Sequence, residues 1–276
     1  MKNLVSTNWL EQNLKTVRVL DGSWHMPNVN RNASEEFNSK HIENSLFFDL
    51  DKHSNQTSSL PHMLPNKIAW EKTISELGIK NSDHVIIYDN SDVVSSCRIW
   101  YNFLYFGHDP NLVSVLDGGL IKWLKENKKV SNKIEKFPVS SYFAKENLSM
   151  VLEKDQINLN IQNKKFELID ARSKERFLGL QPEPRKELRS GNIKGSKNIP
   201  FTDLINKDDR TFKNKEQIKS IFNGINLDPT KNIAFTCGSG VTACVLGLAN
   251  SIISGKNPLI YDGSWSEYGL IKNENI

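Results

Sequence analysis

The stretch NIAFTCGSGVTACVLGLANSI (232–252) predicts a buried β-strand, a short loop with two glycines and an apolar helix, in that order. Short apolar strands that end in small or turn-forming residues also alternate with helical stretches along the rest of the chain. The predicted helices cover residues 66–79, 95–107, 120–127, 214–225 and 241–252. This alternation indicates an α/β fold, and we expect open, mainly parallel sheets flanked by helices.

Four segments of the first half return in the second half about 145 to 151 residues later, which indicates a duplicated domain and not a short-period solenoid. The matching pairs are VRVLDGSW (17–24) with FELIDARS (166–173), HIENSLFFDL (41–50) with NIKGSKNIPF (192–201), HVIIYDNS (84–91) with NIAFTCGS (232–239), and VSVLDGG (113–119) with PLIYDGS (258–264).

A polar, Lys- and Asn-rich stretch at 128–150 separates the two copies. We therefore expect one domain at 1–135, a linker at 136–150 and a second domain at 151–276. The end of this stretch, SYFAKENLSMVL (141–152), is a candidate edge strand of the second domain.

The composition fits a globular protein, since 38% of the 276 residues are hydrophobic and 25% are charged. The net charge of +4 is spread along the chain, so neither nucleic-acid nor membrane binding is expected. No apolar run of about 20 residues and no signal-peptide core occur. Three cysteines without a C-x-x-C spacing predict no disulfide framework and a reducing, cytoplasmic setting. Of these, Cys97 and Cys244 lie in apolar helical stretches and are interpreted as core residues.

The two copies differ in the loop after one strand, because Cys237 opens the second loop where the first has the sequence DNSD (89–92). Gly238 and Gly240 allow successive N–H groups to turn toward one point, and the following helix adds its positive end. Such a loop stabilises an anion, so a cysteine at its first position is a candidate nucleophile in thiolate form. The alternative is that Cys237 is a small hydrophobic residue buried at the end of a strand.

The stretch RFLGLQPEPR (176–185) has an arginine at each end and two prolines that stiffen it. Arg176 and Arg185 are candidates to hold one anionic group, because a guanidinium fork matches a carboxylate in two hydrogen bonds. The alternative is that both are ordinary surface arginines.

A long polar loop at 48–65 contains Asp49, Asp51, His53 and His62. An Asp–His pair there could hold a histidine tautomer and pass a proton. A metal site is not expected because the helical H-x-x-x-H spacing is missing. The alternative is a solvated loop without a chemical role.

These features together resemble the tandem-domain rhodanese superfamily of sulfurtransferases. The resemblance rests on the duplicated α/β domains, the cysteine in the second copy, the PEPR segment (182–185) and the paired DGG (117–119) and YDGSW (261–265) segments. The loop CGSGVTA (237–243) looks like the active loop of the 3-mercaptopyruvate sulfurtransferases, because thiosulfate-using members carry basic residues where this chain has Gly and Ser. The resemblance covers nearly the whole chain, from Trp9 to Gly269.

The resemblance implies two rhodanese-like domains, of which the second is catalytic. The implied reaction moves the sulfur of 3-mercaptopyruvate onto Cys237 as a persulfide and releases pyruvate. The sulfur would then pass to a small thiol, to a thioredoxin-like protein or to cyanide. Neither a metal ion nor an organic cofactor is expected.

The resemblance also assigns site residues by their position in the motifs. Arg176 and Arg185 would bind the substrate. Ser239, His62 and Asp51 would form a proton relay, with His62 coming from the first domain, so the site would lie in a cleft between the domains. The loop that stabilises the persulfide anion would comprise Gly238, Ser239, Gly240, Val241 and Thr242.

Other functions remain open at this point. A thiosulfate sulfurtransferase is the nearest, and a non-enzymatic sulfur-sensing or interaction module is another, although Cys237 and both arginines argue against it. Cysteine-dependent phosphatases need an arginine at the sixth position after the cysteine, where this chain has Ala243. Dinucleotide binding is a weak alternative because the third glycine of G-x-G-x-x-G is missing.

Overall fold

The computed structural model describes residues 3–271. These residues form two compact units, and the main change from one unit to the other falls between Leu148 and Ser149. Two short segments do not follow this linear division of the chain: Ser58–Met63 belongs to unit 2, and Ile205–Phe212 belongs to unit 1.

Unit 1 is an α/β unit. Its elements in chain order are β1 (Leu4–Val5), α1 (Thr7–Asn13), β2 (Arg18–Asp21), α2 (Ala33–Ser39), β3 (His41–Ile42), β4 (Ser45–Phe47), α3 (Lys67–Glu76), β5 (Val85–Tyr88), α4 (Ser96–Tyr105), β6 (Val113–Leu116), α5 (Gly119–Lys125) and β7 (Val130–Ser131). Five strands form a parallel sheet in the order β1-β6-β5-β2-β4, and β3 and β7 form a separate antiparallel pair. Strand β5 is buried at every residue, as expected for a central parallel strand covered on both faces.

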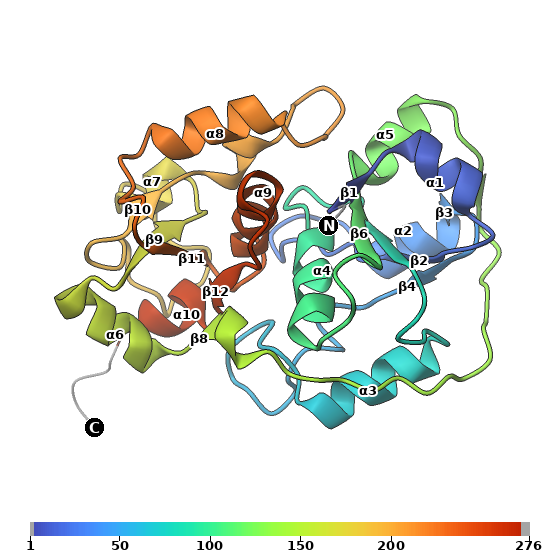
Figure 1. The fold of residues 1–276 in the computed structure, drawn as a ribbon, viewed down its shortest axis with the longest axis horizontal. Helices are drawn as coiled ribbons and strands as arrows, with labels where there is room; N and C mark the ends of the chain where they lie inside the picture. The colour runs from blue at the N-terminus through green and yellow to red at the C-terminus, as the bar shows by residue number, and fades with distance from the viewer. Residues whose placement is uncertain (1–2, 272–276) are drawn as a thin grey trace. The chain divides into compact units, whose positions relative to one another are not determined.

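Unit 2 repeats this arrangement (Figure 1). The short 3₁₀ helix η1 (Leu148–Met150) lies at the change of unit, and the elements that follow are β8 (Val151–Leu152), α6 (Lys154–Asn163), β9 (Phe166–Asp170), α7 (Lys174–Phe177), β10 (Lys197–Asn198), the 3₁₀ helix η2 (Phe201–Leu204), α8 (Lys215–Asn223), β11 (Asn232–Thr236), α9 (Ala243–Ser254), β12 (Leu259–Tyr261) and α10 (Ser264–Tyr268). The five strands are all parallel, in the order β10-β9-β11-β12-β8.

The two sheets have the same strand order once the strands of the sequence repeat are matched. Strands β1, β6, β5, β2 and β4 of unit 1 correspond to β8, β12, β11, β9 and β10 of unit 2. The register agrees as well, because Asp21 pairs with Tyr88 in unit 1 and Asp170 pairs with Thr236 in unit 2. The prediction of a duplicated α/β fold with open parallel sheets is confirmed, and the first loop residue after β5, Asp89, is the counterpart of Cys237.

The five predicted helical stretches correspond to α3, α4, α5, α8 and α9, with ends that differ by a few residues. In the candidate edge strand at 141–152, only Val151 and Leu152 form a strand, β8, which pairs with β12 at the edge of the sheet. Helix α9 packs against β11 and β12 and ends at Gly255, whose φ of 72° is a left-handed conformation that glycine adopts without strain.

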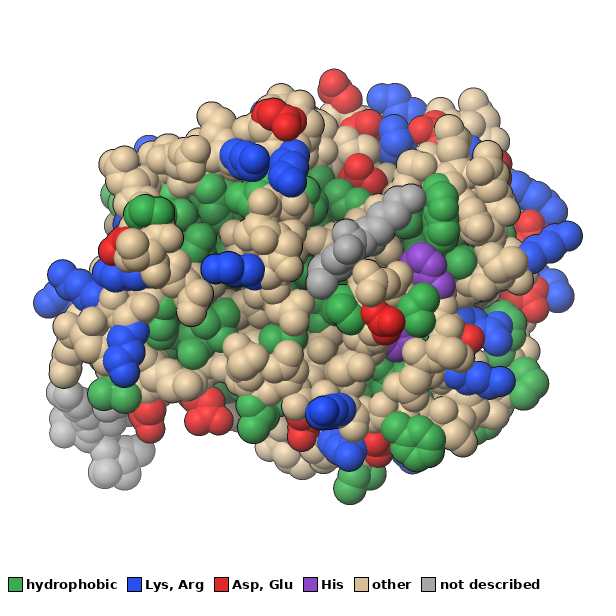
Figure 2. All heavy atoms as spheres, in the orientation of Figure 1, with side chains coloured by type: hydrophobic (Ala, Val, Ile, Leu, Met, Phe, Trp, Pro, Cys, Tyr) green, Lys and Arg blue, Asp and Glu red, His purple; other side chains and the backbone are tan. Residues whose placement is uncertain are grey.

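The surface agrees with the small net charge. On the face drawn in Figure 2, Lys and Arg side chains are interspersed with Asp and Glu side chains. Within residues 3–271, every helix is too short or too polar to cross a membrane.

Candidate functional site

Cys237 follows β11 directly and is 2% exposed. The first turn of α10 holds the backbone of its loop. The N–H of Trp265 donates to the Cys237 carbonyl oxygen at 2.9 Å, and the N–H of Ser266 donates to that of Gly238 at 2.8 Å. The Cys237 N–H in turn donates to Ser264 Oγ at 3.2 Å. Three hydrogen bonds therefore fix the peptide planes on either side of the cysteine.

Beyond the cysteine, the loop presents backbone donors. The N–H groups of Ser239, Val241 and Thr242 make no hydrogen bond within residues 3–271, although Ser239 and Val241 are buried. Gly240 makes the turn with a φ of 76°, which is strained for other residues. Since buried N–H groups are normally paired, and since α9 adds the positive end of its dipole, the loop is suited to hold an anion.

Two members of the predicted proton relay lie together. The Nδ1 atom of His62 is 2.9 Å from Ser239 Oγ, and both side chains are buried. Which of the two donates depends on the tautomer of the imidazole ring. His62 belongs to the first half of the sequence, as expected, and the contacts of the segment Ser58–Met63 group it with unit 2. The long polar loop thus leaves unit 1 after Thr57 and returns to it at Leu64.

The third relay member, Asp51, lies in unit 1. Its two carboxylate oxygens accept hydrogen bonds from the indole Nε1 of Trp24 at 3.1 and 3.0 Å. Two other residues of this polar loop have local contacts. The Asp49 carboxylate accepts from the Lys52 N–H, and His53 Nδ1 lies 3.3 Å from Thr73 Oγ1. Burial, followed by the charge of Lys52, lowers the pKa of His53.

Of the two predicted substrate arginines, Arg176 lies against the cysteine loop. A Cβ atom placed on Gly238 would stand 3.3 Å from Arg176 Nη2. The same guanidinium forms two hydrogen bonds to the buried carboxylate of Glu183, Nη2 to Oε2 at 2.5 Å and Nε to Oε1 at 3.3 Å. Arg185 is partly buried, and its side chain makes no hydrogen bond or ion pair within residues 3–271.

The buried network of charged side chains behind Arg176 was not predicted from the sequence. Arg172 donates to the carboxylates of both Asp170 and Glu183, and its guanidinium carbon lies 4.4 Å from the centroid of the Trp265 ring. Burial by itself would lower the pKa of Arg172, but the two carboxylates raise it on balance. A signal was present in the sequence, because Glu183 is the carboxylate between the two prolines of the PEPR segment.

Among residues 3–271, no three His, Cys, Asp or Glu side chains are grouped so that they could hold a metal ion. Cys97 and Cys244 are both fully buried, in α4 and α9, as interpreted from the sequence. The Cys237 loop with the Ser239–His62 pair and Arg176 is therefore the candidate site of unit 2.

Comparisons with known proteins show which family the chain resembles over its length. The family model of the rhodanese-like domain matches residues 6–126 and 153–270. The 3-mercaptopyruvate sulfurtransferase of Mus musculus is 38% identical over 96% of this chain and 91% of the relative. The thiosulfate sulfurtransferase of the same species is also 38% identical, with the same coverage of both chains.

A solved structure with the rhodanese fold is also similar to this chain. The crystal structure of SseA from Escherichia coli, described with the rhodanese fold of 3-mercaptopyruvate sulfotransferases, superposes with a TM-score of 0.86 and 31% identity. The match covers 97% of this chain and 100% of SseA. Because the family model matches both halves of the sequence and both sheets share one topology, the chain belongs to the rhodanese-like family, with one rhodanese-like domain in each half.

Proposed function

We propose that this chain is a sulfurtransferase that moves the sulfur of 3-mercaptopyruvate to an acceptor through a persulfide on Cys237. The observation that carries the proposal is a buried cysteine at the start of a loop whose N–H groups at Ser239, Val241 and Thr242 have no acceptor in the described chain. The similarity to 3-mercaptopyruvate sulfurtransferases over nearly the whole length supports it.

In the first half-reaction, the Cys237 thiolate attacks the sulfur of 3-mercaptopyruvate. A sulfur–sulfur bond forms while the carbon–sulfur bond of the substrate breaks, and its electron pair leaves on the enolate of pyruvate. The enolate takes up a proton and departs as pyruvate. The loop N–H groups stabilise the negative charge on the sulfur atoms, as an oxyanion hole stabilises a developing charge.

In the second half-reaction, a thiolate or cyanide attacks the outer sulfur of the persulfide, and the Cys237 thiolate leaves. The hydrogen bond between Ser239 and His62 supports a role of this pair in moving the proton that the substrate thiol loses or the enolate gains. Asp51 is proposed as the third member of the relay, and Arg176 and Arg185 are proposed to bind the substrate carboxylate and keto oxygen.

The acceptor is proposed to be a small thiol, a thioredoxin-like protein or cyanide, and the setting to be the cytoplasm. A thiosulfate sulfurtransferase is the second candidate, because the mouse thiosulfate enzyme is as similar as the mercaptopyruvate enzyme. One feature argues against thiosulfate as the sulfur donor: Gly238 and Ser239 bring no positive charge to the loop, whereas thiosulfate carries two negative charges.

The experiment that separates the two candidates measures kcat/KM for both sulfur donors in parallel. Cyanide serves as acceptor for both donors, and a thiol is added as a second acceptor for 3-mercaptopyruvate. We expect a strong preference for 3-mercaptopyruvate. A preference for thiosulfate would select the second candidate, and activity with neither donor would favour a sulfur-binding module.

A further inference from the structure

Four charged side chains of unit 2 form a chain of alternating sign beside the cysteine loop: Asp170, Arg172, Glu183 and Arg176. Arg172 Nη2 lies 2.7 Å from Asp170 Oδ2, and Arg172 Nη1 lies 2.8 Å from Glu183 Oε1. These three side chains are at most 1% exposed, whereas the last member, Arg176, is 21% exposed. The three buried side chains of this charged network are therefore held rigidly, and Arg176 is its solvent-accessible end.

The carboxylate of Glu183 takes one edge of the Arg176 guanidinium. Nη2 and Nε both donate to Glu183, while Nη1 makes no hydrogen bond within residues 3–271. A fork of two hydrogen bonds fixes the plane of a guanidinium as well as its position. Nη1 is thus left as a directed donor, on a group that lies against Gly238 of the cysteine loop.

The charges of the four groups cancel, because two carboxylates face two guanidinium groups. Arg176 therefore reaches the loop with its positive charge already balanced. Arg185 differs, since it stands only two residues after Glu183, within about 7 Å along the chain, and its side chain has no ionic partner in the described chain. Pro184 between them limits how far Arg185 can swing away.

We propose that Glu183 is a positioning residue that divides the work of the two substrate arginines. It locks Arg176 as an oriented, charge-balanced hydrogen-bond donor, and it leaves Arg185 to supply the uncompensated positive charge for the substrate carboxylate. The inference rests on the proposed function and deepens it. Retaining a buried ion pair for orientation is consistent with its energetics, because such pairs contribute little net stability once both charges are desolvated.

If Glu183 has this role, a second substitution should restore part of the pyruvate binding that Arg176→Gln loses. Arg176→Gln removes one positive charge and leaves Glu183 as an excess negative charge next to the substrate carboxylate, so pyruvate, which carries the same carboxylate as the substrate, should bind about tenfold more weakly. Adding Glu183→Gln restores the balance. The double variant should therefore bind pyruvate several-fold more tightly than Arg176→Gln does.

The single variant Glu183→Gln separates positioning from a merely structural role. It frees Arg176 and adds a net positive charge, so pyruvate binding should be at least as tight as in the wild type. The oriented donor is lost, however, and kcat with 3-mercaptopyruvate should fall about tenfold. A structural role alone would lower the unfolding midpoint and weaken kcat and binding together.

Glu187→Gln is the matched control, because it removes a negative charge from an exposed residue of the same loop. It should change neither pyruvate binding nor kcat. Glu183→Asp keeps the charge and shortens the side chain, so it should lower kcat without tightening pyruvate binding, and it covers the case in which Glu183→Gln does not fold.

The measurements are the dissociation constant of pyruvate by calorimetry and the separate kcat and KM values for 3-mercaptopyruvate. The inference is overturned if the double variant binds pyruvate no better than Arg176→Gln, or if Glu183→Gln weakens binding while kcat is kept. Wild-type protein without 3-mercaptopyruvate activity would instead refute the proposed function, so the two failures are distinguishable.

Discussion

The loop after β5 in unit 1 and the loop after β11 in unit 2 occupy equivalent positions of the repeat, but only the first has a carboxylate of its own that accepts its N–H groups. In unit 1, the carboxylate of Asp89 accepts the N–H groups of Ser91 and Ser96, each at 2.9 Å. In unit 2, Cys237 replaces this carboxylate, and three loop N–H groups make no hydrogen bond within the described chain. One loop thus carries its own anion, whereas the other keeps its donors for a substrate.

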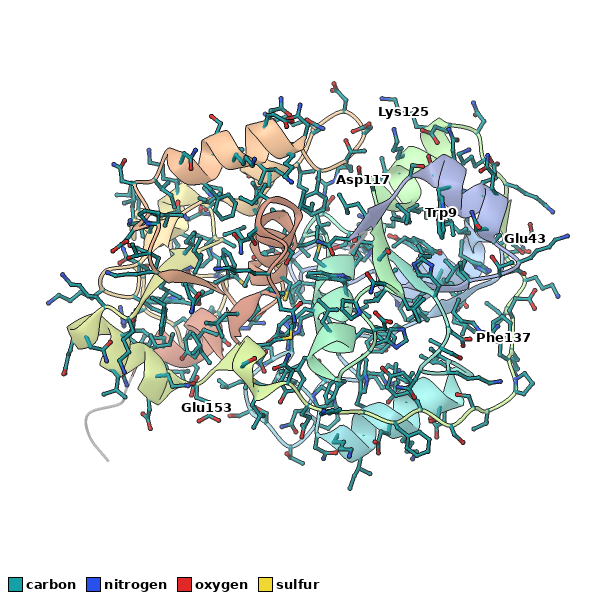
Figure 3. All side chains as sticks on the ribbon, viewed as in Figure 1. Trp9, Glu43, Asp117, Lys125, Phe137 and Glu153 are labelled. Carbon is teal, nitrogen blue, oxygen red and sulfur yellow. The ribbon has the colours of Figure 1, made fainter. Side chains whose placement is uncertain are left out.

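The loop of unit 1 is also covered. The Arg210 guanidinium donates to the carbonyl oxygens of Ser91 and Asp92 at 3.0 and 2.9 Å, and the Phe212 N–H donates to Asp117, labelled in Figure 3, at 2.8 Å. The cavity left beside these residues measures about 10 Å³, room for a single water molecule. The loop of unit 1 therefore has no cysteine, and the cavity beside it is too small for a substrate.

Replacing Cys237 by the aspartate that unit 1 has at the equivalent position should have the largest effect on sulfur transfer. Cys237→Asp installs the internal anion of unit 1 in unit 2, so the carboxylate should take the loop N–H groups and leave no nucleophile. We expect kcat/KM with 3-mercaptopyruvate to fall by about 10³-fold or more. Mass spectrometry after incubation with substrate should detect no added sulfur atom on the variant, and Cys237→Ser serves as the control without a carboxylate.

The reciprocal variant tests whether the nucleophile alone makes the difference. Asp89→Cys in the Cys237→Ser background places a thiol in the loop of unit 1, which stays covered by Arg210 and Phe212. No sulfur transfer is expected. Recovered activity would contradict the comparison, because it would mean that the covered loop still admits a substrate.

The sequence repeat predicted the strands, the parallel sheets and the equivalence of Asp89 and Cys237, because apolar strands with matching ends leave a local pattern. It did not predict that the contacts of the segment Ser58–Met63 lie in unit 2. That grouping depends on the path of the 18-residue polar loop at 48–65, and hydrophobic periodicity does not encode such a path. Nor did it single out Arg172 and Glu183, since a buried ion pair between residues 11 positions apart looks like two surface charges until the fold closes around it.

The ends of the equivalent strands β2 and β9 differ in how their aspartates are neutralised. Asp170 in unit 2 pairs with the guanidinium of Arg172, whereas Asp21 in unit 1 accepts hydrogen bonds from the hydroxyl and the N–H of Ser23 at 2.5 and 2.9 Å. Burial raises the pKa of Asp21 from 3.8 to about 6. Folded unit 1 therefore binds this proton more tightly than the unfolded chain does.

The contribution of Asp21 to the free energy of unfolding of unit 1 should accordingly be largest below about pH 4. It should fall by on the order of 2 kcal/mol as the pH rises to about 6. Asp21→Asn should flatten this dependence, because the amide keeps an acceptor without an ionisable proton. Hydrogen–deuterium exchange of β2 and β5 across this pH range measures unit 1 directly. An unchanged pH profile in the variant would show that another group, such as Asp117, whose pKa burial also raises to about 6, dominates.

The smallest difference between the two sites concerns the residue that follows β6 and β12 by three positions. In unit 1 this is Gly119 with a φ of 54°, and in unit 2 it is Ser264 with a φ of 48°. Glycine adopts this left-handed conformation freely, whereas serine is strained by about 1 kcal/mol. Ser264 offsets the strain with its hydroxyl, which accepts from the Cys237 N–H at 3.2 Å and donates to the Tyr261 carbonyl oxygen at 2.8 Å.

Ser264→Ala loses both hydrogen bonds and keeps the strain, while Ser264→Gly loses both hydrogen bonds and releases the strain. We therefore expect Ser264→Gly to be about 1 kcal/mol more stable than Ser264→Ala in denaturant unfolding, with a few-fold loss of kcat in both, since each leaves the Cys237 N–H without its acceptor. Gly119→Ala is the control in unit 1, where an added Cβ would collide with the Asp89 carbonyl oxygen and should cost more than Ser264→Ala. Equal stability of the two Ser264 variants would mean that the strain at this position is not released by glycine, and the serine would then serve the cysteine loop without a conformational cost.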